Sequence, residues 1–251
     1  MKEKMKEKND ILFGFHSVYE ALKADKRKFY SILISKNRSL GRMENIETIA
    51  RQRNIKIEMV DPELLDKMTD FSNHQGLAAN TSFFPIKKAA EVVRLVQEKK
   101  EPCFILILEN IEDPHNLGAL IRTALCAGVD YILIPKDRSA VPSSTVSRSS
   151  AGAMEHADIF YITNTASILR ALKENGVWVS GLDAGADTSL FDADLTGNIA
   201  LVIGGEHKGI RPLVKKECDF LLSIPNKGNI NSLNASVAGG IAMYEALRQR
   251  R

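Results

Sequence analysis

Three polar segments in the C-terminal half of the chain carry the residue types that could do chemistry. They read ENIEDPHNLGALIRTA at residues 109–124, GGEHKGIRP at 204–212 and IPNKGNINSLNASVAGG at 224–240. The third holds four asparagines and two serines, with one lysine as its only charge, directly before an apolar stretch. Buried amides need hydrogen-bond partners. We therefore expect this segment to pair with a neighbouring loop, with a ligand, or with both.

Five side chains in these segments are candidates for a site. Arg122 falls on a largely apolar helical stretch, where a charge is costly unless it is paired or faces a site. Asn116, Ser232 and Asn234 stand at helix starts, so each is open to a second interpretation as a helix cap. Glu206 precedes a helix, and its negative charge could stabilise the positive end of the helix dipole. His115 and His207 stand next to Asn116 and Glu206 but are expected to be ordinary solvated or hydrogen-bonded histidines.

The three segments follow apolar runs that read as buried strands. These runs are CFILIL, YILIP, VWVSGL, IALVIGG and FLLSIP, and helical stretches alternate with them. This alternation predicts an α/β domain with a parallel sheet covered on both faces. Such sheets place ligands at the carboxyl ends of their strands. The sequence therefore predicts a site at that edge.

Several classes of protein are disfavoured. No strand is followed by G-x-G-x-x-G, and GGEHKGI lacks the Lys-Ser/Thr of a phosphate-binding loop, which argues against a nicotinamide enzyme or an ATPase acting on a metabolite. Cys103, Cys126 and Cys218 are far apart with no CxxC pair, so neither a disulfide framework nor a metal is expected. No apolar run is long enough for a membrane span, and the charged N-terminus has no signal-type stretch. We expect a cytoplasmic protein.

The chain divides into four parts by composition. Residues 1–10 are expected to form a frayed or disordered tail, 11–82 a small α/β unit, 83–102 a linker and helix, and 103–251 the larger domain. Residues 1–100 hold 20 Lys and Arg against 14 Asp and Glu, whereas 101–251 hold 14 against 17. A basic front half is typical of proteins that bind a polyanion, although solvated surfaces commonly carry such a charge.

The three segments together resemble the motifs of the SpoU/TrmH family of RNA ribose 2′-O-methyltransferases, within the SPOUT superfamily. The resemblance covers residues from about 103 to 251. The pattern from GFHSVYEAL to HQGLAA is similar to the RNA-binding domain of the RlmB-type branch, which resembles the ribosomal protein L30. The resemblance implies a deep trefoil knot in the C-terminal domain, S-adenosylmethionine as cofactor, and a homodimer. It also implies a guanosine of large-subunit 23S ribosomal RNA as substrate, free or in a pre-ribosomal particle.

The resemblance assigns roles residue by residue. Arg122 would bind and activate the ribose 2′-hydroxyl and Asn116 would orient it, while Glu206, Ser232 and Asn234 would complete the catalytic pocket. A guanidinium has no acceptor atom, so we expect Arg122 to position a phosphate and stabilise a developing alkoxide. The residues expected to contact the cofactor, largely through backbone groups, are Ile203, Gly204, Gly205, Ile224 and Leu233. Asn226 stands where the family usually has Met, so the loop is expected to be more polar here.

Six basic residues of the front unit are candidates for phosphate contacts, with a solvated surface as the equal alternative. They are Lys26, Arg27, Lys28, Lys36, Arg38 and Arg42. Two other functions stay open: a methyltransferase acting on transfer RNA, and an inactive RNA-binding or ribosome-assembly protein. The intact set of candidate catalytic residues argues against the second.

Overall fold

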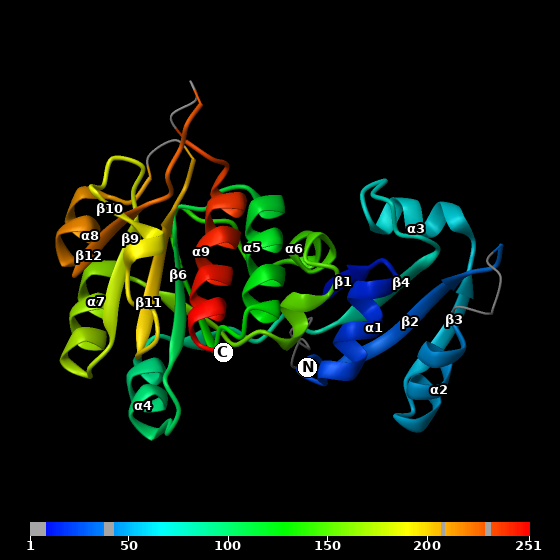
Figure 1. Cartoon of the computed structure of the whole chain (residues 1–251). Helices are drawn as coiled ribbons and strands as arrows, with labels where there is room; N and C mark the ends of the chain where they lie inside the picture. The colour runs from blue at the N-terminus through cyan, green and yellow to red at the C-terminus, as the bar shows by residue number, and fades with distance from the viewer. Residues whose placement is uncertain (1–8, 38–42, 207–208, 229–231) are drawn as a thin grey trace, which may run out of the picture. The chain divides into compact units, whose positions relative to one another are not determined.

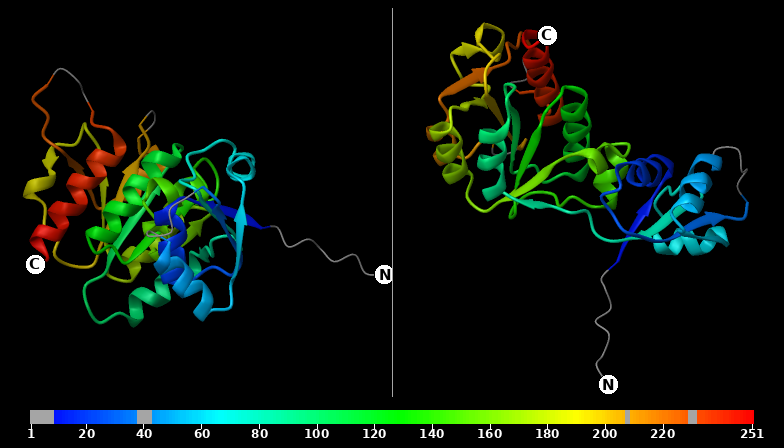
Figure 2. Two further views of the ribbon diagram at one scale, coloured as in Figure 1. Left: turned by 90° about the vertical axis from the view of Figure 1, so that its right-hand side faces the viewer. Right: turned by 90° about the horizontal axis from the view of Figure 1, so that it is seen from below.

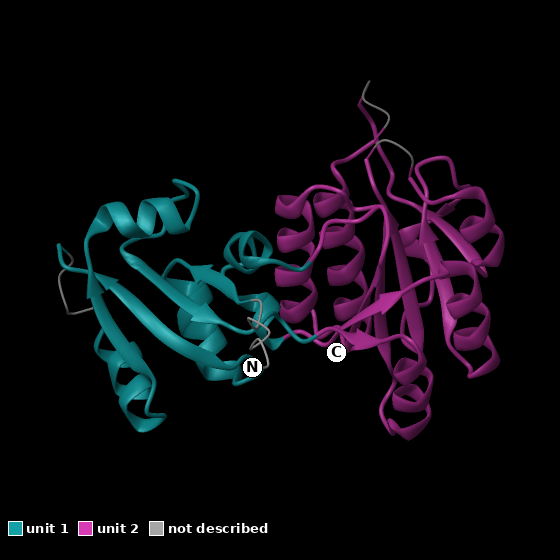
Figure 3. Ribbon diagram, turned by 180° about the vertical axis from the view of Figure 1, so that it is seen from behind, with its two compact units in different colours: residues 1–85, 142–156 teal, residues 86–141, 157–251 magenta. Residues whose placement is uncertain are grey.

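A computed structural model describes residues 9–37, 43–206, 209–228 and 232–251 of the chain. The chain forms two compact units (Figure 3). Unit 1 contains residues 1–85 and 142–156, and unit 2 contains residues 86–141 and 157–251.

Unit 1 is a small α/β unit around a four-stranded mixed sheet. Its strand order is β1-β4-β2-β3; β2 and β3 are parallel, and the β1–β4 and β2–β4 pairs are antiparallel. The strands are β1 (Asp10–Phe13), β2 (Phe29–Ser35), β3 (Lys56–Val60) and β4 (Leu77–Thr81). The helices are α1 (Phe15–Ala24), α2 (Glu44–Gln52), α3 (Pro62–Met68), α6 (Ser144–Ser149) and the 3-10 helix η2 (Ala153–His156). Leu22 and Ile46 from the helices pack with Ile32 and Leu77 from the sheet in a buried apolar core.

A buried ion pair places residues 142–156 in unit 1, although the sequence pattern assigned them to the C-terminal domain. Arg27 donates from Nε to Glu155 at 2.8 Å and from Nη2 to its second oxygen at 3.1 Å, and both side chains are fully buried. Arg27 also donates to Asp10 at 2.7 Å. Asp10 is the first residue of β1, so the predicted tail at 1–10 extends too far into the chain.

Unit 2 contains the parallel sheet that the apolar runs predict. Its described strands follow the order β10-β12-β9-β11-β6-β7-β8-β5, and every pairing is parallel. The five predicted runs form β6 (Phe104–Glu109), β7 (Tyr131–Pro135), β9 (Trp178–Leu182), β11 (Ile199–Gly204) and β12 (Phe220–Ser223). Three further strands have no long apolar run: β5 (Lys87–Lys88), β8 (Ile159–Ile162) and β10 (Thr188–Ser189).

Helices cover both faces of this sheet (Figures 1 and 2). One face packs against α4 (Ala90–Glu98), α7 (Thr165–Glu174) and α8 (Pro212–Glu217). The opposite face carries α5 (Pro114–Cys126) and α9 (Ala235–Gln249), which lie side by side. The remaining described helix of unit 2 is the short 3-10 segment η3 (Leu190–Asp192). Among the described helices, none has the length and apolar content that crossing a membrane requires.

Close packing of α9 against α5 and β11 depends on a glycine. A Cβ atom on Gly239 would lie 2.4 Å from Leu120 Cδ2 and 2.7 Å from Ile203 Cδ1. Both of those side chains are buried, and both would have to shift to make room for a methyl group. A Cβ on the next residue, Gly240, would meet only Thr123 Cγ2, at an ordinary 3.9 Å. The two glycines share one helix but differ in the atoms that a methyl group would contact.

We predict opposite effects for the two alanine variants. Gly239→Ala should lower the free energy of unfolding by about 1–2 kcal/mol, because overpacking outweighs the gain in helix propensity. Gly240→Ala should raise the free energy of unfolding by up to about 1 kcal/mol, because alanine favours the helix and its methyl group meets no close neighbour. Urea unfolding of the two variants measures both values. Equal stability of the two variants would show that Leu120 and Ile203 move aside at no cost.

Candidate functional site

The three polar segments meet at the carboxyl edge of the parallel sheet. Asn110 follows β6, Gly205 follows β11 and Ile224 follows β12. Strands β6 and β11 are direct neighbours, with Glu109 opposite Gly204 in register. The edge predicted from the sequence is therefore where these segments lie.

The start of α5 leaves Asn116 free for another role. Asp113 is the N-cap of this helix, because its side chain accepts a hydrogen bond from the His115 N–H at 2.9 Å. Pro114 occupies the first helical position, where its missing N–H costs nothing. The capping role that the sequence left open for Asn116 is therefore taken by Asp113. Asn116 lies in the first turn with its amide directed elsewhere.

Asn116, Glu206 and Asn234 form a hydrogen-bonded cluster from the three segments. Asn116 Nδ2 donates to Glu206 Oε1 at 3.1 Å. Asn234 Nδ2 donates to Asn116 Oδ1 at 3.1 Å and also to Glu206 Oε1. The two amides orient the carboxylate, and each amide keeps donor or acceptor capacity.

Asn234 also caps α9, as its position in the sequence allowed. Its Oδ1 atom accepts from the backbone N–H of Ser236 at 2.9 Å and of Val237 at 3.3 Å. The cap uses the amide oxygen and the cluster uses the amide nitrogen. One side chain therefore fixes both the start of the last helix and the position of Glu206.

Two glycines allow the backbone segments at this edge to approach one another. A Cβ on Gly204 would lie 2.2 Å from the Gly209 carbonyl carbon, and a Cβ on Gly205 would lie 2.1 Å from the Asn110 oxygen. Real Cβ atoms do not approach so closely. These positions therefore require glycine, and the groups exposed at the site include backbone atoms.

A buried carboxylate lies at the same edge of the sheet. Glu109 ends β6, is fully buried, and accepts hydrogen bonds from Arg211 Nε and from Thr165 Oγ1 at 2.7 Å. Its carbonyl oxygen accepts from the Gly205 N–H at 2.9 Å. Residue 109 therefore holds both Gly205 and Arg211, which stand on either side of Glu206 in the sequence. Removing a partner of a buried charge is strongly destabilising.

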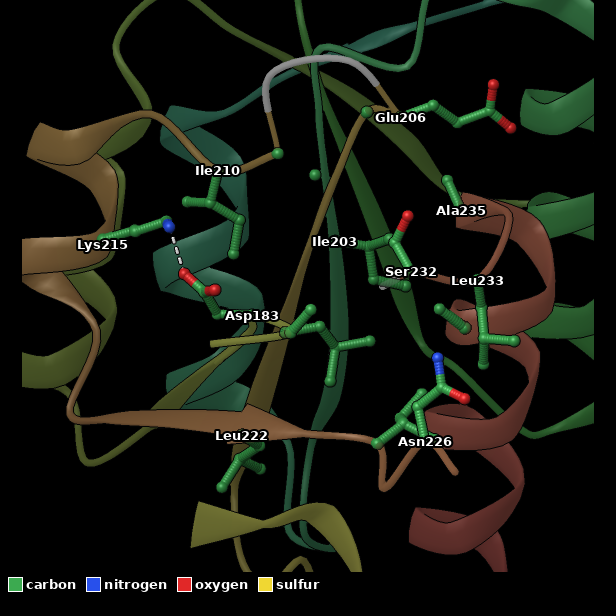
Figure 4. A pocket seen from close by; sticks show the side chains of 17 residues that line it. Asp183, Ile203, Glu206, Ile210, Lys215, Leu222, Asn226, Ser232, Leu233 and Ala235 are labelled. Atoms are coloured by element: carbon green, nitrogen blue, oxygen red, sulfur yellow. Dashed lines mark ion pairs between the residues drawn. The ribbon is translucent and has the colours of Figure 1, made fainter. Parts of the chain in front are cut away.

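A cavity of about 230 Å³ adjoins the cluster (Figure 4). Its wall includes all five residues that the resemblance assigned to the cofactor: Ile203, Gly204, Gly205, Ile224 and Leu233. Glu206, Ser232 and Asn226 also line it. A second cavity of about 220 Å³ is lined by residues that include Asn110, Asp113, Asn116 and Glu206. Glu206 and Gly205 belong to both walls, so the two hollows meet at the cluster.

Arg122 is not part of this assembly within one chain. It is exposed on α5 and lines neither of these cavities. Six residues of α-helix separate it from Asn116, which is about 9 Å along the axis and about 120° around it. Arg122 and Asn116 therefore project in different directions from one helix. The structure brings together four of the five predicted catalytic residues, if Ser232 on the cavity wall is included.

The basic candidates of unit 1 have different surroundings. Arg27 is buried and forms ion pairs with Glu155 and Asp10. The prediction that it contacts phosphate is therefore wrong. Lys26 donates to the His156 carbonyl at 2.9 Å. Lys28 is exposed and lies 5.1 Å from the Tyr30 ring centre, and Lys36 is exposed and pairs with Asp61 at 3.0 Å. Arg38, Arg42 and His207 lie outside the described residues.

Four polar residues of the site were missed by the sequence analysis: Glu109, Asp183, Arg211 and Lys215. Asp183 directly follows β9, so the rule that drew attention to the other strand ends also applied to it. Glu109 was visible as a charge ending an apolar run. Arg211 lies inside the second polar segment but was not singled out, and Lys215 lies outside all three segments. The side chains that pair with them are distant in the chain. Among the described residues, no group of three or more His, Cys, Asp or Glu is placed to hold a metal ion.

Comparison with known proteins gives two family matches. Residues 103–244 match the SpoU rRNA Methylase family, and residues 11–86 match the family of RNA 2′-O ribose methyltransferase substrate-binding domains. The chain is 39% identical over 246 residues to the 23S rRNA (guanosine-2′-O-)-methyltransferase RlmB of Xanthomonas campestris, covering 98% of this chain and 99% of that one. It is 40% identical over 246 residues to Bacillus subtilis YacO, provisionally named a TrmH family tRNA/rRNA methyltransferase, covering 98% of both chains.

A solved structure supports the fold. The SpoU methyltransferase AviRb from Streptomyces viridochromogenes, crystallised with the cofactor AdoMet, superposes with a TM-score of 0.81 at 22% identity. The match covers 96% of this chain and 90% of that one.

The two roles of Asn234 can be separated by substitution. Asn234→Ala should lower the free energy of unfolding by about 1 kcal/mol, because the helix loses its cap. Asn234→Ser should stay within about 0.5 kcal/mol of the parent, because a serine hydroxyl caps a helix about as well. Urea unfolding tests both. A serine variant as unstable as the alanine variant would mean that the bonds to Glu206 and Asn116, and not the cap, provide the stability.

Proposed function

The chain belongs to the SpoU rRNA Methylase family, and on that premise we propose that it transfers the methyl group of S-adenosylmethionine to the ribose 2′-hydroxyl of a guanosine in 23S ribosomal RNA. The membership that the three motifs predicted is confirmed by the family match over residues 103–244. The observation that carries the proposal is the cavity lined by all five expected cofactor residues, adjoining the cluster of Asn116, Glu206 and Asn234.

The cavity suits S-adenosylmethionine in shape and chemistry. Gly204 and Gly205 bring backbone to its wall where no side chain fits. Ile203, Ile224 and Leu233 provide apolar surface for a purine ring. Glu206 also lines the cavity, and its carboxylate would suit a positively charged ligand. When bound, the cofactor supplies an already activated methyl group.

The protein's own residues then have to align a hydroxyl and exclude water. Asn116 and Asn234 hold the Glu206 carboxylate in one orientation and can hydrogen-bond a ribose beside it. Ser232, on the cavity wall, can complete that pocket. Arg122 can bind the adjacent phosphate and stabilise negative charge on the ribose oxygen. A guanidinium cannot accept the proton, which leaves to a neighbouring group or to water.

The proposal includes a homodimer in which Arg122 acts across the interface. It is supported by Arg122, which is exposed and lines neither cavity of its own chain. It is supported also by α9, where Val237 is 50% and Tyr244 51% exposed. Large exposed apolar side chains on one helix are typical of a protein interface. In the dimer that we propose, two-fold symmetry makes the contact of each Arg122 with its partner's site equivalent.

Two structural features belong to the same proposal. We expect the C-terminal domain to contain a deep trefoil knot and unit 1 to be a ribosomal-protein-L30-like RNA-binding domain. The bonds from Asn234 to Asn116 and Glu206 support the first, because they bring the last segment against the loops after β6 and β11. The substrate-binding family match over residues 11–86 supports the second. Lys28 and Lys36 are exposed and remain candidates for phosphate contacts.

Ribosomal RNA is favoured over transfer RNA because the chain has a substrate-binding unit and near-full-length similarity to RlmB. We expect the enzyme to act in the cytoplasm on free RNA or an assembling particle. Bacillus subtilis YacO, to which the chain is also similar, is named for both transfer RNA and ribosomal RNA. Methylation of transfer RNA is therefore an alternative outcome of the test below. The intact set of candidate catalytic residues, Asn116, Arg122, Glu206, Ser232 and Asn234, argues against an inactive assembly protein.

Transfer of labelled methyl from S-adenosylmethionine tests the proposal directly. The purified protein should label 23S ribosomal RNA lacking this modification, and nuclease mapping should place the label on a guanosine ribose. Bulk transfer RNA should stay unlabelled. Label in transfer RNA alone would keep the reaction and overturn the substrate. No label in free RNA or in precursor particles, despite cofactor binding, would favour the assembly protein.

Mixed dimers test the role of Arg122. Arg122→Ala and Glu206→Gln should each lose methyl transfer by several orders of magnitude while still binding S-adenosylhomocysteine. Co-refolding the two variants in equal amounts should restore about a quarter of the parent activity, because half the dimers would hold one intact site of two. Without restoration, Arg122 would act within its own chain. Near-normal turnover by Arg122→Ala alone would remove it from the mechanism.

A further inference from the structure

An ion pair lies on the wall of the cavity, away from the catalytic cluster. Asp183 directly follows β9, and Lys215 lies on α8, and both side chains line the cavity. Lys215 Nζ pairs with Asp183 Oδ2. Figure 4 places the pair on the opposite side of the cavity from Ser232 and Glu206. None of the roles assigned above uses either residue.

The Asp183 carboxylate is held in a defined position. Its Oδ1 atom accepts from the Gly185 N–H at 3.0 Å, and its own N–H donates to the Leu222 carbonyl at 3.0 Å. The Ala186 N–H closes the turn by donating to the Asp183 carbonyl at 3.1 Å. A carboxylate offers about four acceptor positions, and Gly185 and Lys215 use two of them. The remaining acceptor positions can accept hydrogen bonds from a ligand that enters the cavity.

The charge of Asp183 is maintained by its neighbours. The hydrogen bond from Lys215, followed by that from the Gly185 N–H, holds the pKa of the Asp183 carboxyl below its ordinary value. It is therefore ionised at neutral pH and can only accept hydrogen bonds. Ile203, Ile210 and Leu222 form apolar wall around the pair. A fixed acceptor in apolar surroundings selects strongly for a donor.

We propose that Asp183, held in position by Lys215, binds hydrogen-bond donors of the cofactor at a point remote from the transferred methyl. This rests on the proposed function, since it takes the cavity to be the S-adenosylmethionine site. Two groups of that molecule have the required chemistry: the ribose hydroxyls and the ammonium of the methionine end. Both persist in the product, so Asp183 contributes to affinity and not to the chemical step.

Calorimetric binding of two ligands tests the proposal. S-adenosylhomocysteine carries both donor groups, and 5′-methylthioadenosine carries the ribose hydroxyls without the amino acid. Asp183→Asn should weaken S-adenosylhomocysteine binding about tenfold or more, because a charged acceptor is lost. An equal loss for 5′-methylthioadenosine assigns the contact to the ribose, and a loss confined to S-adenosylhomocysteine assigns it to the ammonium. Unchanged affinity for both ligands overturns the proposal.

A matched control comes from the same turn. Asp187 is exposed and does not line the cavity, so Asp187→Asn removes the same charge nearby and should bind both ligands like the parent. In steady-state assays Asp183→Asn should raise KM for S-adenosylmethionine about tenfold with kcat nearly unchanged. A fall in kcat with unchanged KM contradicts the proposal.

Folding and identity of the site are checked separately. If Asp183→Asn fails to fold, Asp183→Glu replaces it; the carboxylate then moves by one methylene, and the same loss of affinity is expected. If the parent protein binds neither ligand, the proposed function fails. A parent that binds both, with Asp183 variants that also bind both normally, contradicts only the inference about Asp183.

Discussion

The parallel pairing of β6 with β11 is the constraint on which the site depends. Glu109 stands opposite Gly204 in this pairing, and the two strands end together. The buried Glu109 carboxylate must be neutralised, because an unpaired charge in the interior is very costly. Arg211 and Thr165 satisfy it, and the Glu109 carbonyl holds Gly205. The interaction that stabilises the interior thereby fixes the loop that carries Glu206.

The hydrogen-bonded cluster of Asn116, Glu206 and Asn234 uses few groups, and one of them has two purposes. Asn234 caps the last helix with its oxygen and orients Glu206 with its nitrogen. Asn116 is available for the cluster because Asp113 takes the cap of α5. Such sharing suits a reaction whose methyl donor is already activated, since the protein needs alignment more than additional acids or bases. Arg122, which the proposed mechanism brings to the substrate, lines neither cavity of its own chain, so association of two chains is part of that proposal.

Unit 1 shows how a charge count can mislead about individual residues. The excess of Lys and Arg in the first 100 residues suggested a polyanion partner. Arg27 belongs to that excess, yet it is buried against Glu155, 128 residues away, and ties residues 142–156 to this unit. Burial alone would lower the pKa of Arg27, but the two carboxylates more than offset this and raise it. The surface available for RNA is therefore less basic than the composition suggests.

Local patterns in the sequence determined five strands of the parallel sheet and the edge where the site lies, because apolar runs and helix starts depend on neighbouring residues. The three motifs also identified the family. Only the tertiary structure decided that Arg27 is internal, that Asn116 is not a cap and that Asp183 pairs with Lys215. Each of these depends on a partner or a direction set by packing between segments far apart in the chain. Hydrophobic periodicity predicts helices and strands, but it does not predict which polar side chains will contact one another in the folded chain. The folded chain decides this because every buried charge and amide must find a partner.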